Sequence, residues 1–245
     1  MITVQNTHTL PELQSVPLSE PDGERWQGIS HHNLISSLIA YGGERGIRFE
    51  QSTIALSSDQ QDMAATFGLY DPRISPGLPT DCNLSLGITT SNAKRFALTT
   101  YYGVTTIWGA GIPFGVLDVS KRHTFGIDID TLAEQVWDAF RIEGRGLGRE
   151  IERMKNKPCL IDQTSVALVE AAENYLLPFS RIGRVLKEIR SPTTNIGEPW
   201  RVWSVLHSFA LIARMNPAVP TNATTQPGQL AQVNGFRELL MKKGK

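Results

Sequence analysis

The fold class is decided by residues 83–140, which read NLSLGITTSNAKRFALTTYYGVTTIWGAGIPFGVLDVSKRHTFGIDIDTLAEQVWDAF. Short runs rich in Thr, Tyr, Val and Ile favour β-strands, and the Ser-Asn-Ala-Lys sequence at 91–94 has the residues of a turn between two of them. A basic sequence, Lys-Arg-His-Thr, follows at 121–124. Beyond it, apolar residues recur at the spacing of one helix face, at Leu132, Val136, Trp137 and Phe140. The chain therefore changes from strands to helices within this stretch.

The same patterns extend to both sides. Residues 46–56 and 63–70 read as two strands of a hairpin, with a polar turn at 59–62 between them. A short amphipathic helix precedes them and is expected to end at the pair Gly42-Gly43. After the central stretch, helices are expected at 165–177, 179–189 and 200–215. This order predicts an α+β fold, in which an antiparallel β-sheet from about residues 46–120 packs with helices from the C-terminal half.

The sequence suggests three parts. Residues 1–28 are predicted to form an extended lead, since prolines interrupt them at positions 11, 17 and 21. Residues 29–225 are predicted to form a single α+β domain, β-rich at 46–120 and helical at 128–215. Residues 226–245 are predicted to be a basic C-terminal tail, because lysines gather at the end of the chain.

Composition places the chain among ordinary globular proteins. Its 245 residues carry a formal net charge of zero and are 40% hydrophobic, which is enough to bury a sizeable core. Residues 1–80 carry nine acidic and four basic residues, a net charge of −5, so the rest of the chain carries +5. Such a split indicates either a basic face or an uneven solvated surface.

The N-terminus lacks the pattern of a secretory signal, and the chain has no apolar run of about 18 residues. We therefore expect a cytoplasmic protein without membrane contact. Cys82 and Cys159 have no metal-ligand spacing and are expected to be isolated buried thiols.

The segments that could carry catalysis also have structural explanations. Gly144, Gly146 and Gly148 follow a helix at the wrong spacing for a dinucleotide loop, so we interpret them as a flexible helix break. Asp128 and Asp130 could bind a cation, but acids in that position also cap a helix. We predict no catalytic residue, no metal ligand and no cofactor.

The histidines are interpreted in the same way. His31 and His32 are expected in the first turn of a surface helix. His207 lies in an apolar helix, where a core or interface position is favoured over a catalytic one. A metal-dependent enzyme is a further alternative, built on Asp128, Asp130 and His123.

Basic residues gather at two places in the sequence. One is a pair of predicted turns that hold Lys94, Arg95, Lys121, Arg122 and His123. The other is a helix on which cations recur every three residues, at Arg181, Arg184 and Lys187. Phosphate binding needs such charges, because the release of condensed counterions drives non-specific nucleic-acid affinity. We therefore predict that nucleic acid contacts these residues.

Aromatic residues lie among the predicted strands, at Phe96, Tyr101, Tyr102 and Trp108. If they are exposed on the sheet, they could stack on the bases of a single strand. The alternative is that they fill the core while the basic residues solubilise the outer face. The sequence leaves both interpretations open, and the near-neutral pI weakens the case for a nucleic-acid-binding face.

Several segments carry a family resemblance: FGLY at 67–70, GVTTIW at 103–108, Arg122-His123-Thr124 and PWRVWSVLHSFA at 199–210. Together they resemble the domain-of-unknown-function 932 family of phage- and plasmid-like proteins, over about residues 30–225. The chain resembles a divergent member, because His207-Ser208 stands where the family usually has Asn-Ala. The resemblance implies a protein of a mobile genetic element acting in a bacterial host, and it implies no catalytic residues.

These observations predict a non-enzymatic accessory protein of a phage, prophage or plasmid that binds nucleic acid, including single-stranded DNA. The alternative is a protein-interaction module, such as an inhibitor of a host defence or restriction system, for which the charge split would provide an electrostatic interface. A homo-oligomer is also expected, because the edge strands of an open sheet need cover.

Overall fold

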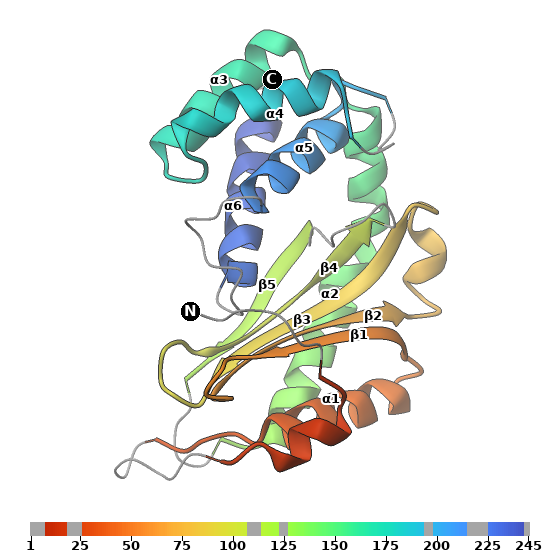
Figure 1. The fold of residues 1–245 in the computed structure, drawn as a ribbon. Coiled ribbons are helices and arrows are strands. Elements are labelled where there is room, and N and C mark those ends of the chain that lie inside the picture. Colours follow the sequence, from red (N-terminus) through yellow and green to blue (C-terminus); the bar gives the residue numbers. More distant parts are fainter. Residues whose placement is uncertain are drawn as a thin grey trace.

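The computed structural model describes residues 8–18, 26–106, 114–122, 127–193, 198–214 and 225–242. In these ranges the strands come first and most of the helices follow, as Figure 1 shows. The predicted α+β class is therefore confirmed, with an antiparallel sheet in the N-terminal half and helices mostly in the C-terminal half.

The sheet is an antiparallel meander in which each strand pairs with the next one along the chain. Its strands are β1 (Arg48–Leu56), β2 (Asp62–Tyr70), β3 (Cys82–Ser91), β4 (Leu98–Thr106) and β5 (Phe114–Lys121). Two strands of such a meander meet at each hairpin turn, so the turns alternate between the two ends of the sheet.

β4 is continuous through a glycine near its C-terminal end. Gly103 lies inside β4 and pairs with Gly115 of β5, so this glycine does not interrupt the ladder. From the sequence alone, a glycine that pairs inside a strand cannot be distinguished from a glycine at which a strand ends. Residues 107–113, between β4 and β5, lie outside the described residues.

The helices are α1 (His31–Glu44), α2 (Ile129–Asn156), α3 (Ile161–Glu173), α4 (Ile182–Arg190), α5 (Val202–Arg214) and α6 (Thr225–Lys242). Short 3-10 turns occur at η1 (Pro11–Ser15), η2 (Ser75–Gly77) and η3 (Phe179–Arg181). The predicted helices at 165–177, 179–189 and 200–215 correspond to α3, to η3 with α4, and to α5. None of the helices in the described ranges combines the length and apolarity that a bilayer-spanning segment requires.

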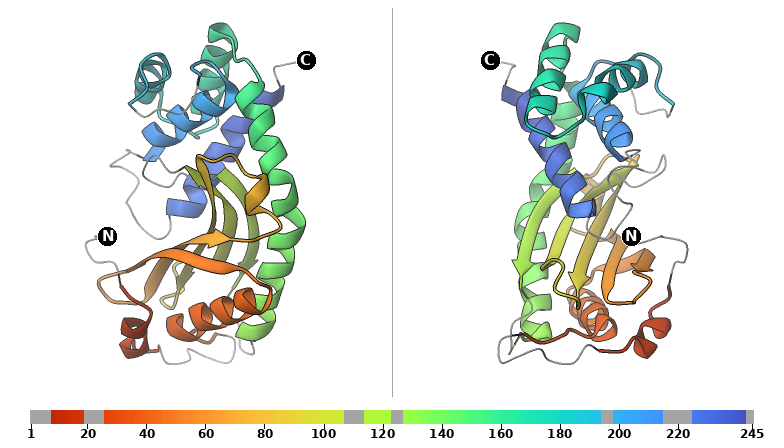
Figure 2. Two further views of the ribbon diagram at one scale, coloured as in Figure 1. Left: turned by 90° about the vertical axis from the view of Figure 1, so that its right-hand side faces the viewer. Right: turned by 60° about the vertical axis from the view of Figure 1, so that its left-hand side comes forward.

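The helices form two groups around the sheet. α1 and α2 pack against each other and against the sheet, whereas α3, α4, α5 and α6 form a helical layer beyond one of its ends (Figure 1). α2 connects the two groups, because it runs from beside α1 up to the helical layer (Figure 2). α6 also leaves the layer to contact β5 and β3.

α2 contradicts the prediction that Gly144, Gly146 and Gly148 break a helix. It continues for 28 residues through all three. A Cβ at Gly148 would lie 2.0 Å from the carbonyl oxygen of Gly77, and one at Gly144 would lie 2.7 Å from the side chain of Ile74, whereas Gly146 has open space around it. Two of the glycines therefore let α2 approach the loop between β2 and β3.

The described parts of the predicted lead and tail both contain residues of the core. Within the lead, η1 buries Leu13 in the core. Most of the predicted basic tail belongs to α6, an 18-residue helix that packs against α3, α5 and β5. Its buried residues recur at helical spacing, at Val233, Phe236 and Leu240.

An aromatic cluster fixes α1 and α2 on the sheet. The Trp137 indole N–H donates to the Leu38 carbonyl oxygen at 2.9 Å. The Trp137 ring meets Phe49 and Phe140 edge to face, with centroids 5.8 and 5.3 Å apart. Such pairs each add about 0.5–1.5 kcal/mol beyond the area they bury. Cys82 and Cys159 are buried free thiols, as predicted.

Candidate nucleic-acid interface

Basic residues from two separate turns meet at one end of the sheet. The register pairs Asp62 with Ser91 and Leu98 with Lys121, so the β1–β2 turn, the β3–β4 turn and the end of β5 lie side by side. This end carries the predicted residues Lys94, Arg95, Lys121 and Arg122, which we name the basic rim. All four are exposed. His123, the fifth residue predicted here, lies outside the described residues.

Arg95 is the anchored member of the basic rim. Its guanidinium reaches Asp59 Oδ2 and Asp62 Oδ2, each at 2.5 Å. Asp62 is 2% exposed and also accepts the Ser91 hydroxyl at 2.6 Å. These contacts tie the β1–β2 turn to the β3–β4 turn, so the rim has a fixed shape.

The local electrostatics leave the basic rim positive. Hydrogen bonds from Ser57 and Arg95 lower the pKa of Asp59 to about 2, so Asp59 is ionised at neutral pH. The rim has four cations, and two carboxylates, those of Asp59 and Asp62, pair with Arg95. The net charge is therefore +2. The remaining positive charge lies mainly on Lys94, Lys121 and Arg122.

Lys94 occupies an unusual backbone position. Its φ is +61°, in the left-handed region, at the β3–β4 turn. Its ammonium lies 5.0 Å from the ring centroid of Trp26, a distance at which a cation is attracted to an aromatic face. The turn therefore presents a lysine beside an aromatic ring, which is the pairing that single-strand binders use.

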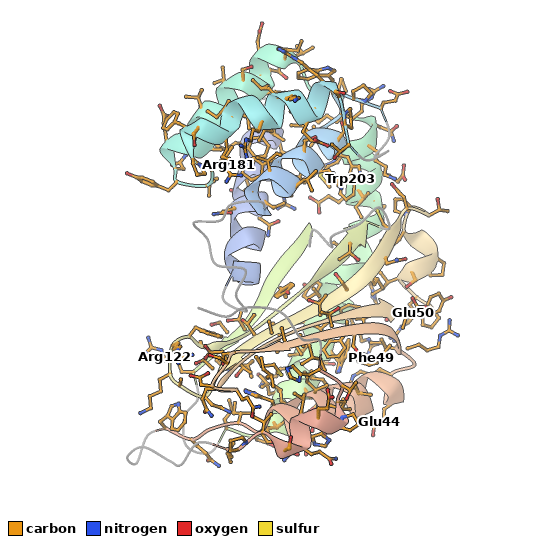
Figure 3. The ribbon with its side chains drawn as sticks, viewed as in Figure 1. Glu44, Phe49, Glu50, Arg122, Arg181 and Trp203 are labelled. Carbon is orange, nitrogen blue, oxygen red and sulfur yellow. The ribbon has the colours of Figure 1, made fainter. Side chains whose placement is uncertain are left out.

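The remaining predicted cations belong to a different region. Arg181 ends η3, and Arg184 and Lys187 are exposed on α4 in the helical layer. Figure 3 places Arg122 at the lower left and Arg181 in the layer at the top. The structure thus divides the predicted basic residues into two groups at opposite ends of the molecule.

Two of the four predicted stacking aromatics are buried in the core and not exposed on the sheet. Tyr101 and Tyr102 are each 1% exposed. Tyr101 lies across its partner Gly87 in β3, and burial raises its pKa, with a hydrogen bond to Thr66 opposing the shift. Phe96 is half-buried against Ala64. Core filling therefore accounts for both tyrosines, and Trp108 lies outside the described residues.

Asp128 caps the N-terminus of α2, and Asp130 lies in its first turn. Asp128 Oδ1 accepts the backbone N–H of Asp130 at 3.1 Å, and the hydroxyl of Ser37 donates to Asp130 at 2.8 Å. Within the described part of the chain, no group of three His, Cys, Asp or Glu side chains converges as metal ligands would. The metal-dependent alternative also relied on His123, which that part does not include.

Two of the histidines are buried. His31 is 1% exposed at the start of α1, which corrects its predicted surface position. The reason is that α1 lies between α2 and η1, so its first turn is covered. His207 is 6% exposed on α5, and burial lowers its pKa, with the nearby Glu188 opposing the shift. The predicted core position of His207 is confirmed.

A small pocket lies where sequence reasoning gave no signal. Its volume is about 140 Å³, and it opens between η1, α1 and β1. Figure 3 shows Phe49 and Glu50, which line it, on the side away from Arg122. The other lining residues are Leu10, Ile35, Ile39, Ser52, Ile54 and Phe67. They come from distant parts of the chain, so only the folded structure brings them together.

Comparison with known proteins finds no family model, no curated protein and no solved structure that matches this chain. The resemblance to the domain-of-unknown-function 932 family therefore stays a prediction. The same holds for the mobile-element origin, the host defence partner and the cytoplasmic location.

Proposed function

We propose that this protein binds nucleic acid through the basic rim, by contacts to the phosphate backbone. The observation that carries the proposal is the convergence of Lys94, Arg95, Lys121 and Arg122 at one end of the sheet, with Arg95 held by two carboxylates. The ion pairs of Arg95 fix the β1–β2 turn against the β3–β4 turn that carries Lys94, so these turns need little reordering on binding and less entropy is lost.

Phosphate contact supports this proposal better than a stacking platform does. Tyr101 and Tyr102 are buried, and the rings near the rim, Trp26 beside Lys94 and Phe96 against Ala64, are both half-buried. Phosphate contacts carry little sequence information. We therefore expect binding without sequence preference, in which single strands fit the rim because their flexible backbone can follow adjacent turns.

The salt dependence of binding tests the proposal. A single strand that contacts Z phosphates gives a slope of about −0.7Z in log affinity against log salt. Three to four rim cations should give a slope of about −2 to −3, so affinity should fall about 20- to 50-fold between about 50 mM and about 200 mM salt. Fluorescence anisotropy of labelled single-stranded and double-stranded oligonucleotides measures both quantities.

Charge-removal variants locate the site. Lys121→Ala with Arg122→Ala should reduce the slope by about 1.4. The matched control is Arg184→Ala with Lys187→Ala on α4, which removes the same charge from the helical layer and should leave the slope unchanged. Absence of binding at low salt, or a larger loss in the α4 variant than in the rim variant, would refute the proposal.

A further inference from the structure

The pocket between η1, α1 and β1 has the size and the lining of a site for a small molecule. Its volume is about 140 Å³. Most of its lining is apolar, namely Leu10, Ile35, Ile39, Phe49, Ile54 and Phe67. A cavity of about 150 Å³ with a lining of Leu, Ile and Phe is large enough to hold benzene, whereas an α-helix with its side chains, about 10–12 Å across, would not fit. The pocket therefore favours a compact apolar group of about the size of one aromatic ring.

The walls of the pocket are formed before any ligand binds. Ile54 and Phe67 are buried in the core, and the Phe49 ring meets the Phe67 ring edge to face, with centroids 5.6 Å apart. Leu10, Ile39 and Phe49 are half-buried, so they still offer apolar surface to a ligand. Because packing fixes these side chains, a ligand would not have to order them, and little entropy would be lost on binding.

A β-bulge adds a carboxylate to this pocket. Phe49 and Gln51 of β1 pair with two consecutive residues of β2, so Glu50 between them is an extra residue without a partner in β2. Neighbouring side chains of a regular strand point to opposite faces of the sheet. Phe49 and Glu50 nevertheless line the same pocket (Figure 3). The bulge explains this arrangement, because an extra residue redirects a side chain.

The polar groups of the pocket lie at its mouth. Glu50 and Ser52 are the exposed residues of the lining. Among the described residues, none forms an ion pair with the Glu50 carboxylate. All the lining residues also belong to residues 1–80, which carry a net charge of −5. An apolar pocket with an anionic mouth fits a ligand that joins an apolar body to a cationic group.

We propose that this pocket binds a small amine that carries one positive charge, with its apolar body inside and its ammonium group at Glu50. The apolar body gains free energy by leaving water. The ammonium group stays at the exposed mouth, so no charge has to be buried, and the Ser52 hydroxyl can accept one of its hydrogens. This inference is independent of nucleic-acid binding, because the pocket lies on the side away from Arg122 (Figure 3).

Titration of the full chain with three ligands of similar size tests the proposal. Benzylamine is cationic, benzyl alcohol is neutral and benzoate is anionic, and all three carry the same ring. Ligand-observed NMR should show that benzylamine binds with a dissociation constant of about 1 mM, which is ordinary for about eight non-hydrogen atoms. Benzyl alcohol should bind about two- to fivefold more weakly, as expected for the loss of an exposed ion pair, and benzoate more weakly still. Absence of saturable benzylamine binding, or equal binding of the amine and the alcohol, overturns the proposal.

Glu50→Gln tests the role of the carboxylate. This variant should bind benzylamine and benzyl alcohol equally, because it loses the ion pair and keeps the apolar walls. The matched control is Glu44→Gln, since Glu44 is an exposed acid of α1 that does not line the pocket; it should keep the preference for the amine. A Glu50→Gln variant that keeps this preference shows that another group selects the cation, and the proposal fails.

Ser52→Phe tests the position of the ligand. The new ring should fill the pocket and abolish the binding of all three ligands. The matched control is Thr53→Phe, because Thr53 is exposed as well but points to the opposite face of β1; it should bind benzylamine like the wild type. Both positions are exposed and phenylalanine favours strands, so both variants should fold, which their Tm values check. Benzylamine binding that survives in Ser52→Phe places the ligand elsewhere and overturns the proposal.

Discussion

Replacing Gly148 with alanine should destabilise the protein, although alanine is the better helix former. The ideal Cβ at Gly148 would lie 2.0 Å from the carbonyl oxygen of Gly77 and 2.8 Å from its carbonyl carbon. Both atoms belong to the backbone, so no side-chain rotation can relieve the contact. Either α2 or the loop after β2 has to move by more than 1 Å to reach ordinary contact, which starts near 3.4 Å.

The expected magnitude follows from two opposing terms. An alanine inside a helix gains about 1 kcal/mol over glycine. Overpacking against an immobile neighbour costs about 3 kcal/mol, the upper end of the usual range. The net loss for Gly148→Ala is therefore about 2 kcal/mol, or about 4–8 °C in Tm for a domain of this size.

Gly146→Ala is the matched control, two residues away in the same helix. No atom lies within 4 Å of its Cβ position, so only the helix-forming term acts and Tm should rise by about 2–4 °C. Urea unfolding followed by circular dichroism gives both free energies of unfolding. If Gly148→Ala is as stable as Gly146→Ala, α2 does not approach the Gly77 turn and the packing argument fails.

Three further predictions concern the sheet and two titratable groups. Gly87→Ala should cost about 3 kcal/mol or more in urea unfolding, because its Cβ would lie 1.7 Å from the buried ring of Tyr101. Burial lowers the pKa of His207, so as pH drops below 6.5 the unfolded chain binds a proton at this imidazole before the folded chain does. The free energy of unfolding should therefore decrease below this pH. A His207→Gln variant should show a shallower fall in Tm. The pKa of Asp59 is lowered from 3.8 to about 2, chiefly by the hydrogen bond from Ser57. The stabilising effect of its ionised carboxylate is therefore complete above pH 3.8 and is lost as the pH falls to about 2. Acid titration of Asp59→Asn, followed by fluorescence, should lack this part of the transition.

The sequence predicts the strands and most helices because their signals are local. Alternating and helical periodicities at 46–106 and 161–214 come from residues a few positions apart. The continuity of α2 is not local. Its glycines cost about 1 kcal/mol each in helix propensity, and whether they break the helix depends on a loop some 70 residues earlier. Sequence patterns therefore fail where a distant segment offsets a local preference.

The candidate site shows the same boundary between local and distant information. Composition and spacing identified the basic residues, including Lys94 and Lys121, because charge is visible in the sequence. The pairing of Arg95 with Asp59 and Asp62 depends on the register of three strands. The burial of Tyr101 depends on a glycine across the sheet. Single-residue properties were predictable from the sequence, and partnerships were not.

The length of α2 keeps the two groups of predicted cations apart. Its 28 residues span about 42 Å, from the part of the molecule near α1 to the helical layer that carries α4 (Figure 2). Exposed charges separated by more than a Debye length, about 8–10 Å near physiological salt, are largely screened from each other. The rim variant and the α4 variant therefore report on two separate surfaces, and a change in the salt slope in only one of them assigns the phosphate contacts to that surface.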